Sequence, residues 1–344
     1  MHLEIHPPLP PMEAKSVDSV PVGDEWQYEP KWDGFRCLAF REDAKIDLQS
    51  KSTQPLSRYF PELITALGRL KSKMFVLDGE ICVPAQGSFS FDALLQRIHS
   101  AASRVQRLAS ETPAIYAVFD LLAAEDGRSL LAQPLRERRS RLEQFAAAYF
   151  DNDSIRLSLA TPKLAQARKW LAKTGATLDG IIAKRRDMSY RSGERDGMQK
   201  IKNFRSADCV VGGFRYAAGS KVVGSLLLGL YNVKGLLDHV GFTSSIAAAD
   251  RPELTKKLER LIQPPGFTGN APGGPSRWSR GKENVWQPLK PNLVVEVRFD
   301  HVSSRRFRHG TKFLRWRPDK APKQCTMDQL AQRQSDLLQL LKVK

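Results

Sequence analysis

The sequence contains little cysteine and no long apolar run. Its 344 residues include only four cysteines, Cys37, Cys82, Cys209 and Cys325, which lie far apart with no Cys-x-x-Cys pair. This spacing argues against a disulfide framework and a zinc site, and favours small buried side chains in a reducing compartment. No stretch approaches the roughly 18 apolar residues that a membrane helix needs, and the proline-rich start lacks a secretory core. We therefore expect an intracellular protein with no membrane partner.

Acidic side chains are in the minority. There are 37 Asp and Glu residues against 54 Lys and Arg residues, which gives a formal net charge of +17. Residues 184–205 carry eight basic and three acidic side chains, and residues 298–320 carry eight basic and two acidic ones. These two segments therefore hold 11 of the 17 excess charges. On a basic surface that is only solvated, the charges could be spread evenly along the chain. Their clustering in two segments favours a polyanionic partner, with nucleic acid as the first candidate.

The pattern of apolar residues changes partway along the chain. Strands are expected at 27–30, 75–83, 115–122 and 181–184, and helices at 134–150 and 163–173. After about Arg205, short β segments dominate, at 208–214, 225–231, 239–243, 293–302 and 312–316, with one helix at 252–262 and a Pro/Gly-rich surface loop at 263–281. Many short strands separated by glycines are typical of a small barrel. The sequence predicts an α+β protein with domains at 1–205 and 206–344, the second ending in a C-terminal helix.

One lysine lies in a setting that suits a nucleophile. Lys31 stands in the segment Glu-Pro-Lys-Trp-Asp-Gly-Phe-Arg, residues 29–36, between a predicted strand and a tight turn. An amine attacks only when deprotonated, and the ordinary pKa of lysine is about 10.4. Burial and neighbouring cations lower that pKa. By itself the Lys-x-Asp-Gly pattern is short, and an exposed turn explains it equally well.

Further charged and aromatic residues follow in order along the chain. They are Asp78 and Glu80, Phe119, Asp179 and Lys184, Lys200 and Lys202, and Arg317, Asp319 and Lys320. Alternation along a strand would place Lys200 and Lys202 on one face, but Asp179 and Lys184 on opposite faces. Taken singly, each of these residues fits a turn, a packed core or a solvated surface.

Taken together, the segments from residue 28 to residue 320 resemble the motifs of the covalent nucleotidyltransferase superfamily, which includes ATP-dependent DNA ligases and mRNA capping enzymes. The segments Ser-Arg-Tyr-Phe-Pro-Glu-Leu (57–63) and Phe-Leu-Arg-Trp-Arg-Pro-Asp-Lys (313–320) are similar to the bacterial ligases of the LigC and LigD type. The resemblance implies an adenylation domain with antiparallel sheets flanked by helices, followed by an OB-fold barrel. Because only 30 residues precede Lys31 and no cysteine cluster exists, it implies ATP rather than NAD, in a standalone enzyme.

The resemblance also implies a role for each residue. Lys31 would attack the α-phosphorus of ATP, and the AMP would pass to the 5′-phosphate of a nick in double-stranded DNA before the 3′-hydroxyl displaces it. The remaining roles are Lys200 and Lys202 on the α-phosphate, Arg36 and Glu80 on the ribose, Phe119 stacked on adenine, Glu29 at the adenine amino group, Asp33 and Lys184 in the nucleotide pocket, Asp179 with Glu80 on Mg²⁺ (Mn²⁺ as a substitute), Arg317, Asp319 and Lys320 over the pyrophosphate, and Lys51 and Arg58 on nucleic acid.

This chain departs from the family pattern at three positions. Asp179 stands where the family commonly has Glu, Lys51 where ligases commonly have Arg, and Met198 where a tryptophan is common. The shorter Asp179 has less reach toward a metal ion. Lysine lacks the bidentate fork with which arginine grips a phosphate. None of these changes removes a charge that the mechanism needs.

Other functions share parts of this pattern. A capping guanylyltransferase would use the same lysine with GTP, an RNA ligase would seal other ends, and a catalytically inactive nucleic-acid-binding module would explain the charge alone. The segments at residues 58–63 and 315–320, which are similar to the LigC and LigD type, favour a DNA ligase over these alternatives. We further expect a monomer of the bacterial cytoplasm, associated with the nucleoid, that acts in DNA repair with a Ku-like or polymerase partner.

Overall fold

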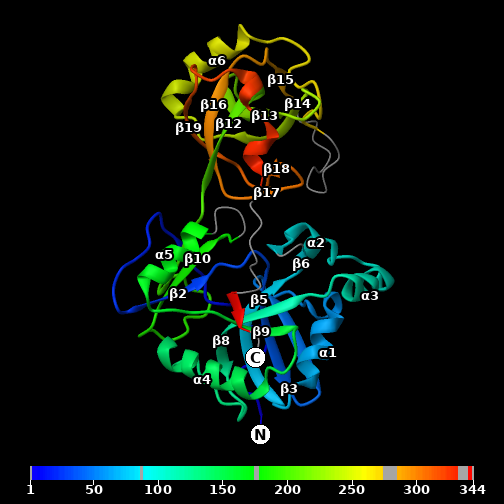
Figure 1. Cartoon of the computed structure of the whole chain (residues 1–344), viewed down its shortest axis with the longest axis vertical. Helices are drawn as coiled ribbons and strands as arrows, with labels where there is room; N and C mark the ends of the chain where they lie inside the picture. Colours follow the sequence, from blue (N-terminus) through cyan, green and yellow to red (C-terminus); the bar gives the residue numbers. More distant parts are fainter. Residues whose placement is uncertain (1, 86–87, 174–177, 274–284, 332–339, 343–344) are drawn as a thin grey trace. The chain divides into compact units, whose positions relative to one another are not determined.

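The chain divides into two compact units. The structure is a computed structural model that describes residues 2–85, 88–173, 178–273, 285–331 and 340–342 (Figure 1). Unit 1 comprises Met1–Asn203 and Arg333–Lys344, and unit 2 comprises Phe204–Gln332. The sequence-based boundary at residue 205 therefore lies two residues beyond the division. The end of the chain, which we had assigned to the second domain, belongs instead to unit 1.

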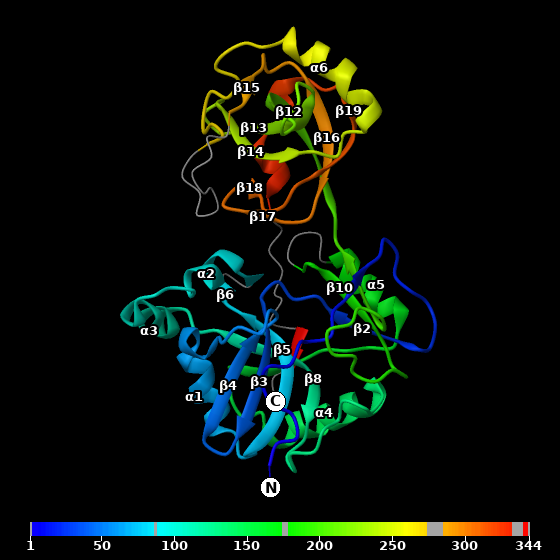
Figure 2. The same ribbon diagram turned by 180° about the vertical axis from the view of Figure 1, so that it is seen from behind.

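Unit 1 is built around a six-stranded sheet with the order β20-β9-β8-β5-β3-β4. Its strands are β3 (Phe35–Glu42), β4 (Lys45–Ser50), β5 (Met74–Cys82), β8 (Ile115–Ala123), β9 (Ile155–Ser158) and β20 (Leu341–Lys342). The neighbours pair antiparallel, except that β8 and β9 are parallel. Helices α1 (Pro61–Arg69) and α4 (Leu135–Tyr149) pack against this sheet (Figure 2). Strand β8 is buried along its whole length, so its side chains contribute to apolar clusters on both faces.

A second sheet of unit 1 has four strands in the order β1-β11-β10-β2. They are β1 (Lys15–Ser16), β2 (Trp26–Pro30), β10 (Gly180–Arg185) and β11 (Met198–Lys202), with α5 (Leu164–Lys173) packed on β10 and β2. The smaller elements are β6 (Pro84–Ala85), β7 (Ser88–Phe89), α2 (Phe91–Gln96), α3 (Ala102–Glu111) and the 3₁₀ turn η1 (Ser57–Tyr59). Because β2 ends at Pro30 and β3 begins at Phe35, the short segment between them joins the two sheets.

Buried arginines hold these elements together. Arg41 donates hydrogen bonds to the carbonyl oxygens of Leu67, Gly68 and Leu70, at 2.5, 3.0 and 2.8 Å. The last carbonyls of a helix have no partner within the helix, so this guanidinium satisfies the end of α1 from the neighbouring strand β3. In the same way, Arg138 of α4 pairs with Asp120 of β8 through two bonds of 2.9 Å.

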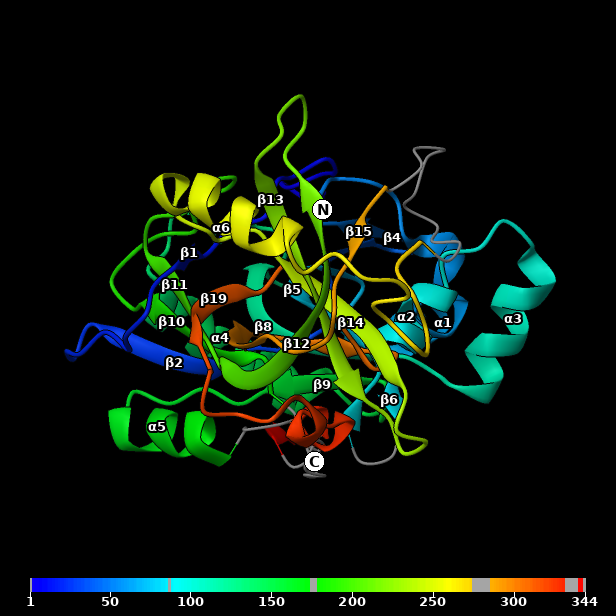
Figure 3. The same ribbon diagram turned by 90° about the horizontal axis from the view of Figure 1, so that it is seen from above.

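Unit 2 contains a sheet with the order β14-β13-β12-β16-β19, with β15 paired to β12. Its elements are β12 (Arg205–Tyr216), β13 (Val223–Tyr231), β14 (Leu237–Thr243), β15 (Gln287–Pro288), β16 (Val294–Phe299), β17 (Val302–Ser303), β18 (Arg306–Phe307), β19 (Lys312–Trp316), α6 (Arg251–Glu259) and the 3₁₀ turns η2 (Ala248–Asp250), η3 (Pro322–Gln324) and η4 (Met327–Leu330). Figure 3 shows β13 and β14 side by side, as their antiparallel register requires. A bridge between Thr243 and Thr311 joins the two outer strands, which makes the sheet a small closed barrel.

Glycines allow the barrel core to pack closely. A side chain added at Gly212 would lie 2.6 Å from the ring of Phe267, and one at Gly229 would lie 2.8 Å from Leu237. Only glycine leaves room for these side chains to pack directly on the strand backbone. The predicted α+β class is confirmed, and most predicted strands occur within two residues of their expected ends. Strands β3 and β4 and helix α1 were not predicted.

The predicted C-terminal helix falls on a part of the chain, residues 332–339, that lies outside the described residues, so it stays a prediction. Residues 341–342 form strand β20. This strand pairs with β9, and Leu341 is only 3% exposed. The apolar ending of the chain is therefore used for edge pairing in unit 1. Separately, none of the helices among the described residues is long and apolar enough to cross a membrane.

We expect the replacement of Asp120 by Ala to lower the free energy of unfolding of unit 1 by about 3–5 kcal/mol, because Arg138 would keep a buried charge without its partner. Burial alone would raise the pKa of Asp120, but Arg138 holds that pKa below its ordinary value, so the pair is ionised at neutral pH. Urea unfolding followed by tryptophan fluorescence measures the loss. The control is Asp153→Ala, because Asp153 pairs with Arg156 at 3.3 Å but is 81% exposed. Equal losses in the two variants would contradict the assignment.

Candidate active site

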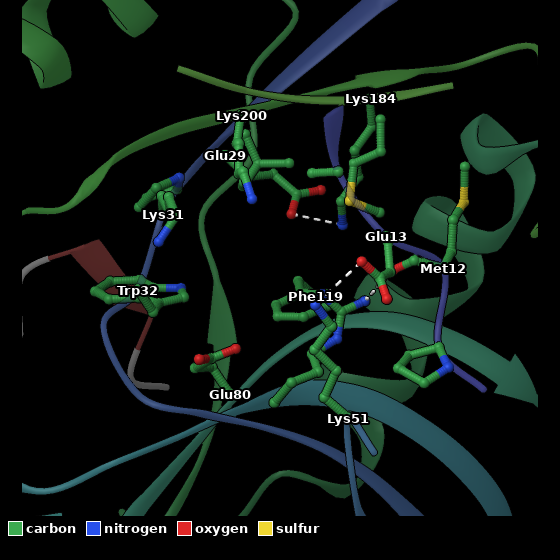
Figure 4. Close-up of a pocket in the computed structure, with 16 residues that line it drawn as sticks. Met12, Glu13, Glu29, Lys31, Trp32, Lys51, Glu80, Phe119, Lys184 and Lys200 are labelled. Carbon is green, nitrogen blue, oxygen red and sulfur yellow. Dashed lines mark hydrogen bonds and ion pairs between the residues drawn. The ribbon is translucent and has the colours of Figure 1, made fainter. Parts of the chain in front are cut away.

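A cavity of about 190 Å³ opens in unit 1 where its two sheets meet. Side chains from both sheets line it: Glu29 from β2, Arg36 from β3, Glu80 from β5, Phe119 from β8, Lys184 from β10 and Lys200 from β11. Lys31 and Trp32, from the segment that joins the sheets, complete its wall (Figure 4). Residues that are distant in the sequence therefore share one pocket.

Lys31 has the surroundings that its predicted role requires. Its backbone N–H donates to the carbonyl of Gly180 at 3.0 Å, which fixes the chain immediately after β2. Its amine forms an ion pair with Asp179. Burial is the largest cause that lowers the pKa of Lys31, and the charges of Lys202 and Lys200 act in the same direction. Glu80 and Asp33 oppose them, and the resulting pKa is about 8. With a pKa near 8, about one amine in ten is deprotonated at pH 7.

Lys200 and Lys202 lie on the same face of β11, as predicted from strand alternation. Lys200 lines the pocket, whereas Ile201 between them packs in the apolar cluster beneath β10 and β2. Burial lowers the pKa of Lys200, and the nearby charges of Lys202, Lys51 and Arg195 lower it further. Several cations thus face one cavity, which makes it a site for an anion such as a phosphate.

Arg36 is held rigidly by residues that the sequence reading had not assigned to the site. Its guanidinium donates two hydrogen bonds of 2.6 Å to Asp78, and it lies 4.5 Å from the ring centroid of Phe119. The hydroxyl of Tyr190 donates to Asp78 at 2.7 Å and accepts from the backbone N–H of Met12 at 3.0 Å. Burial alone would lower the pKa of Arg36, but the ion pair with Asp78 raises it. For Asp78 the sequence does offer a signal, because Asp78 and Glu80 lie two residues apart on one predicted strand.

The aromatic wall of the pocket carries a buried ion pair. Lys184 pairs with Glu29 at 2.7 Å, and its amine lies 4.4 Å from the ring centroid of Phe119. Gln27 donates to the other oxygen of Glu29 at 2.9 Å. Strand alternation had predicted that Asp179 and Lys184 face opposite sides. That argument fails because β10 begins only at Gly180, whose φ of +140° redirects the chain after Asp179.

Three carboxylates, those of Asp33, Glu80 and Asp179, lie around Lys31 and could hold a divalent cation. Burial is the largest cause that raises the pKa of Glu80, and the charges of Asp33 and Asp78 act in the same direction. Arg36 and Lys31 oppose them, and the resulting pKa is about 7. Asp179 is 6% exposed and contacts the Lys31 amine. Carboxylate oxygens are the ligands that Mg²⁺ prefers, and a cation would relieve the crowding of negative charge at Glu80. Carboxylate oxygens of Asp33 and Asp179 lie within 4.8 Å of each other, so this part of the site could hold such an ion.

The two residues predicted to contact nucleic acid lie in different places. Lys51 lines the pocket and forms an ion pair of 3.1 Å with Glu13. Glu13 also forms an ion pair of 3.1 Å with Arg195. Arg58 does not line it: its guanidinium donates to the carbonyl of Ser100 at 3.0 Å. The sequence reading missed the contribution of the segment Pro11–Ala14, because nothing in its composition indicates that it crosses the pocket.

Arg317, Asp319 and Lys320 belong to unit 2. Arg317 pairs with Asp319 and with Asp208, both at 2.8 Å, and Lys320 lies 3.7 Å from Asp208. Asp319 and Asp208 thus hold the two cations together after the end of β19. The pKa of Asp319 is lowered to about 2 by its hydrogen bonds from Arg317.

Comparison with known proteins covers both units. The family model "ATP dependent DNA ligase domain" matches residues 11–202, and "ATP dependent DNA ligase C terminal region" matches residues 219–320. DNA ligase C2 of Mycolicibacterium smegmatis is 43% identical over 346 residues, and DNA ligase C of Mycobacterium tuberculosis is 42% identical, each alignment covering 96% of both chains. The solved ligase domain of M. tuberculosis LigD is 30% identical, with a TM-score of 0.49, and covers 92% of this chain and 98% of that chain.

We expect the Lys31 amine to react with an acylating reagent at a rate that rises about tenfold per pH unit and levels off near pH 8, since only the neutral amine attacks. Peptide mass spectrometry on metal-free protein measures the modification of this residue. Replacing Lys200 with Met should move the plateau to higher pH, because a neighbouring positive charge is lost. Lys51→Met, which alters another lysine of the same pocket, is the control. A plateau above pH 10 in the unmodified protein would contradict the lowered pKa.

Proposed function

The chain belongs to the ATP-dependent DNA ligase family, and we propose that the pocket of unit 1 forms its covalent AMP adduct on Lys31. Membership confirms the resemblance to the LigC and LigD type, and with it a DNA ligase that seals nicks through a lysyl-AMP intermediate. The observation that carries the assignment is a buried amine with a lowered pKa in a pocket that also contains Lys200, Phe119 and Arg36.

The first step joins the lysine to the nucleotide. The neutral Nζ of Lys31 forms a bond to the α-phosphorus of ATP, the bond from that phosphorus to the β-phosphate oxygen breaks, and pyrophosphate leaves while the amine loses its proton to solvent. Lys200 and Lys202 neutralise the charge that builds on the α-phosphate oxygens, which is the main contribution a protein makes to phosphoryl transfer. The contact with Asp179 orients the amine before attack.

The aromatic wall accounts for the choice of base. Phe119 stacks on adenine, and the carboxylate of Glu29 accepts a hydrogen bond from the adenine amino group. Guanine presents a carbonyl oxygen at that position, which a carboxylate repels, so the site favours ATP over GTP. Arg36 and Glu80 hold the ribose, with Arg36 kept in place by Asp78. Asp33 and Lys184 complete the electrostatic surroundings of the nucleotide.

Asp179, with Glu80, would hold Mg²⁺, for which Mn²⁺ could substitute. The ion would supply charge neutralisation on the phosphates. Arg317, Asp319 and Lys320 of unit 2 act on the pyrophosphate during lysyl-AMP formation. The Asp208 contacts that orient Arg317 and Lys320 support a shared role for these two cations.

Nicked double-stranded DNA is the second substrate. Lys51 contacts the 5′-phosphate. The reason is that Lys51 lines the pocket close to Lys200, where the phosphate of the adenylate is attacked. Arg58 contacts DNA farther from the pocket. We place the enzyme in bacterial DNA repair, as a cytoplasmic, nucleoid-associated monomer that works with a Ku-like or polymerase partner. The M. tuberculosis relative LigD, named as a non-homologous end joining protein, supports the repair role.

Incubation with α-labelled ATP should give a covalent, alkali-stable adduct on the unmodified enzyme and none on Lys31→Ala, because this change removes the amine that attacks the α-phosphorus. Gel autoradiography measures the adduct. Lys169→Ala, a change on the outer helix α5, is the control and should keep it. An adduct formed from labelled GTP but not from ATP would instead identify a guanylyltransferase.

Arg317→Ala and Lys320→Ala should slow lysyl-AMP formation at least about tenfold while leaving the sealing of pre-adenylated nicks within a few-fold of the unmodified rate. The reason is that pyrophosphate departs only in the first step. Single-turnover assays of the two steps measure the difference. Arg315→Ala, a change on β19 just before these two residues, is the control, because Arg315 pairs with Glu296 at 2.7 Å. Equal losses in both steps would refute a role restricted to pyrophosphate.

A further inference from the structure

The C-terminal strand β20 lies at the nucleotide pocket of unit 1. Leu341 pairs with Ser158 and Lys342 with Leu157, in antiparallel register on the edge of β9. The backbone N–H of Leu159 donates to the carbonyl of Leu340 at 3.3 Å, which extends the pairing by one residue. In the chain, β20 follows unit 2, yet it completes the six-stranded sheet of unit 1.

The side chain of Leu341 is buried among residues that shape the pocket. It is 3% exposed and belongs to an apolar cluster with Trp32, Phe119 and Leu178. Trp32 is the residue after Lys31 in the chain, and both Trp32 and Phe119 line the cavity. Figure 4 shows Trp32 beside the red C-terminal strand, on the pocket wall below Lys31. The last described strand thus packs behind the wall that faces the nucleotide.

A second contact connects β20 with Trp32. The indole N–H of Trp32 donates to the hydroxyl of Ser158 at 2.9 Å, and Ser158 is the residue that pairs with Leu341. The carbonyl of Ser158 accepts from buried Arg139 at 2.9 Å, which holds β9 against α4. The indole is therefore fixed at its N–H by β9 and across its apolar surface by the cluster that contains Leu341. Phe89 contacts it edge to face, with ring centroids 5.7 Å apart.

We propose that Leu341 of β20 is a positioning residue for lysyl-AMP formation, and that it acts through Trp32. The strand backs the indole, and the indole forms the wall against which the nucleotide is aligned with Lys31. An error of about 1 Å in such a wall can reduce a rate by up to about 100-fold, because the reacting atoms no longer meet in line. This proposal rests on the proposed function, since it concerns the same pocket.

The test measures lysyl-AMP formation in the full chain as a function of ATP concentration. Leu341→Ala should raise the apparent KM for ATP about tenfold, while Leu341→Met, which retains the volume of the side chain, should stay near the unmodified value. The control is Leu142→Ala, because Leu142 is fully buried in the main core of unit 1 and does not line the pocket. It should reduce thermal stability without changing the KM. Should Leu341→Ala fail to fold, Leu341→Val makes the same test with a smaller loss of volume.

A double-mutant cycle identifies the route of the effect. If Leu341 acts through Trp32, then Leu341→Ala should change the KM less than about twofold in a Trp32→Ala background, because residues that act through one another are not additive. An unchanged KM in Leu341→Ala, or fully additive losses in the double variant, would overturn the proposal. The absence of any adduct in the unmodified enzyme would instead refute the proposed function, so the two failures are distinguishable.

Discussion

The site depends on keeping one amine neutral inside a pocket whose purpose is to bind polyanions. Removal from water favours the uncharged form of Lys31, and the positive charges of Lys200 and Lys202 act in the same direction. Those cations also attract the phosphates that Lys31 must attack. Burial and cation clustering therefore serve the nucleophile and the substrate together. The carboxylates Glu80 and Asp33 oppose the effect, so the pKa of Lys31 falls to about 8 and not further.

Meeting that requirement takes two sheets, because neither contains all of the residues. Strand β11 supplies the lysines, and strands β3, β5 and β8 supply Arg36, Glu80 and Phe119. The buried pairs Arg36–Asp78 and Lys184–Glu29 fix side chains that would otherwise adopt many rotamers. Buried ion pairs contribute little net stability, since desolvation offsets their attraction. Their value here is geometric, because a rigid guanidinium and a rigid carboxylate fix the positions that we propose for the ribose and the adenine.

The sequence predicted the residues of the pocket better than it predicted the elements that carry them. Lys31, Glu29, Arg36, Phe119 and Lys200 follow short motifs whose chemistry is local. Strand β3 escaped detection because its buried Arg36 and Arg41 read as surface residues until their partners Asp78 and the end of α1 are known. The pairing of Asp179 with Lys31 was hidden by Gly180, the first residue of β10, whose φ of +140° redirects the chain. Interactions between distant segments are what a single sequence does not display.

The same reasoning explains why the adenylation unit is not one continuous piece of chain. Its pocket is bordered at one side by Met12 and Glu13, which lie before β1, and backed at another by Leu341, which lies beyond unit 2. An edge strand offers unpaired N–H and C=O groups, so β9 needs a cover, and β20 provides it. A two-residue strand has too little surface to be stable by itself, so its position depends on burying Leu341 against the cluster that contains Trp32. The cover of the sheet edge and the wall of the pocket are thus stabilised by the same contacts, which makes β20 part of the unit that carries the pocket.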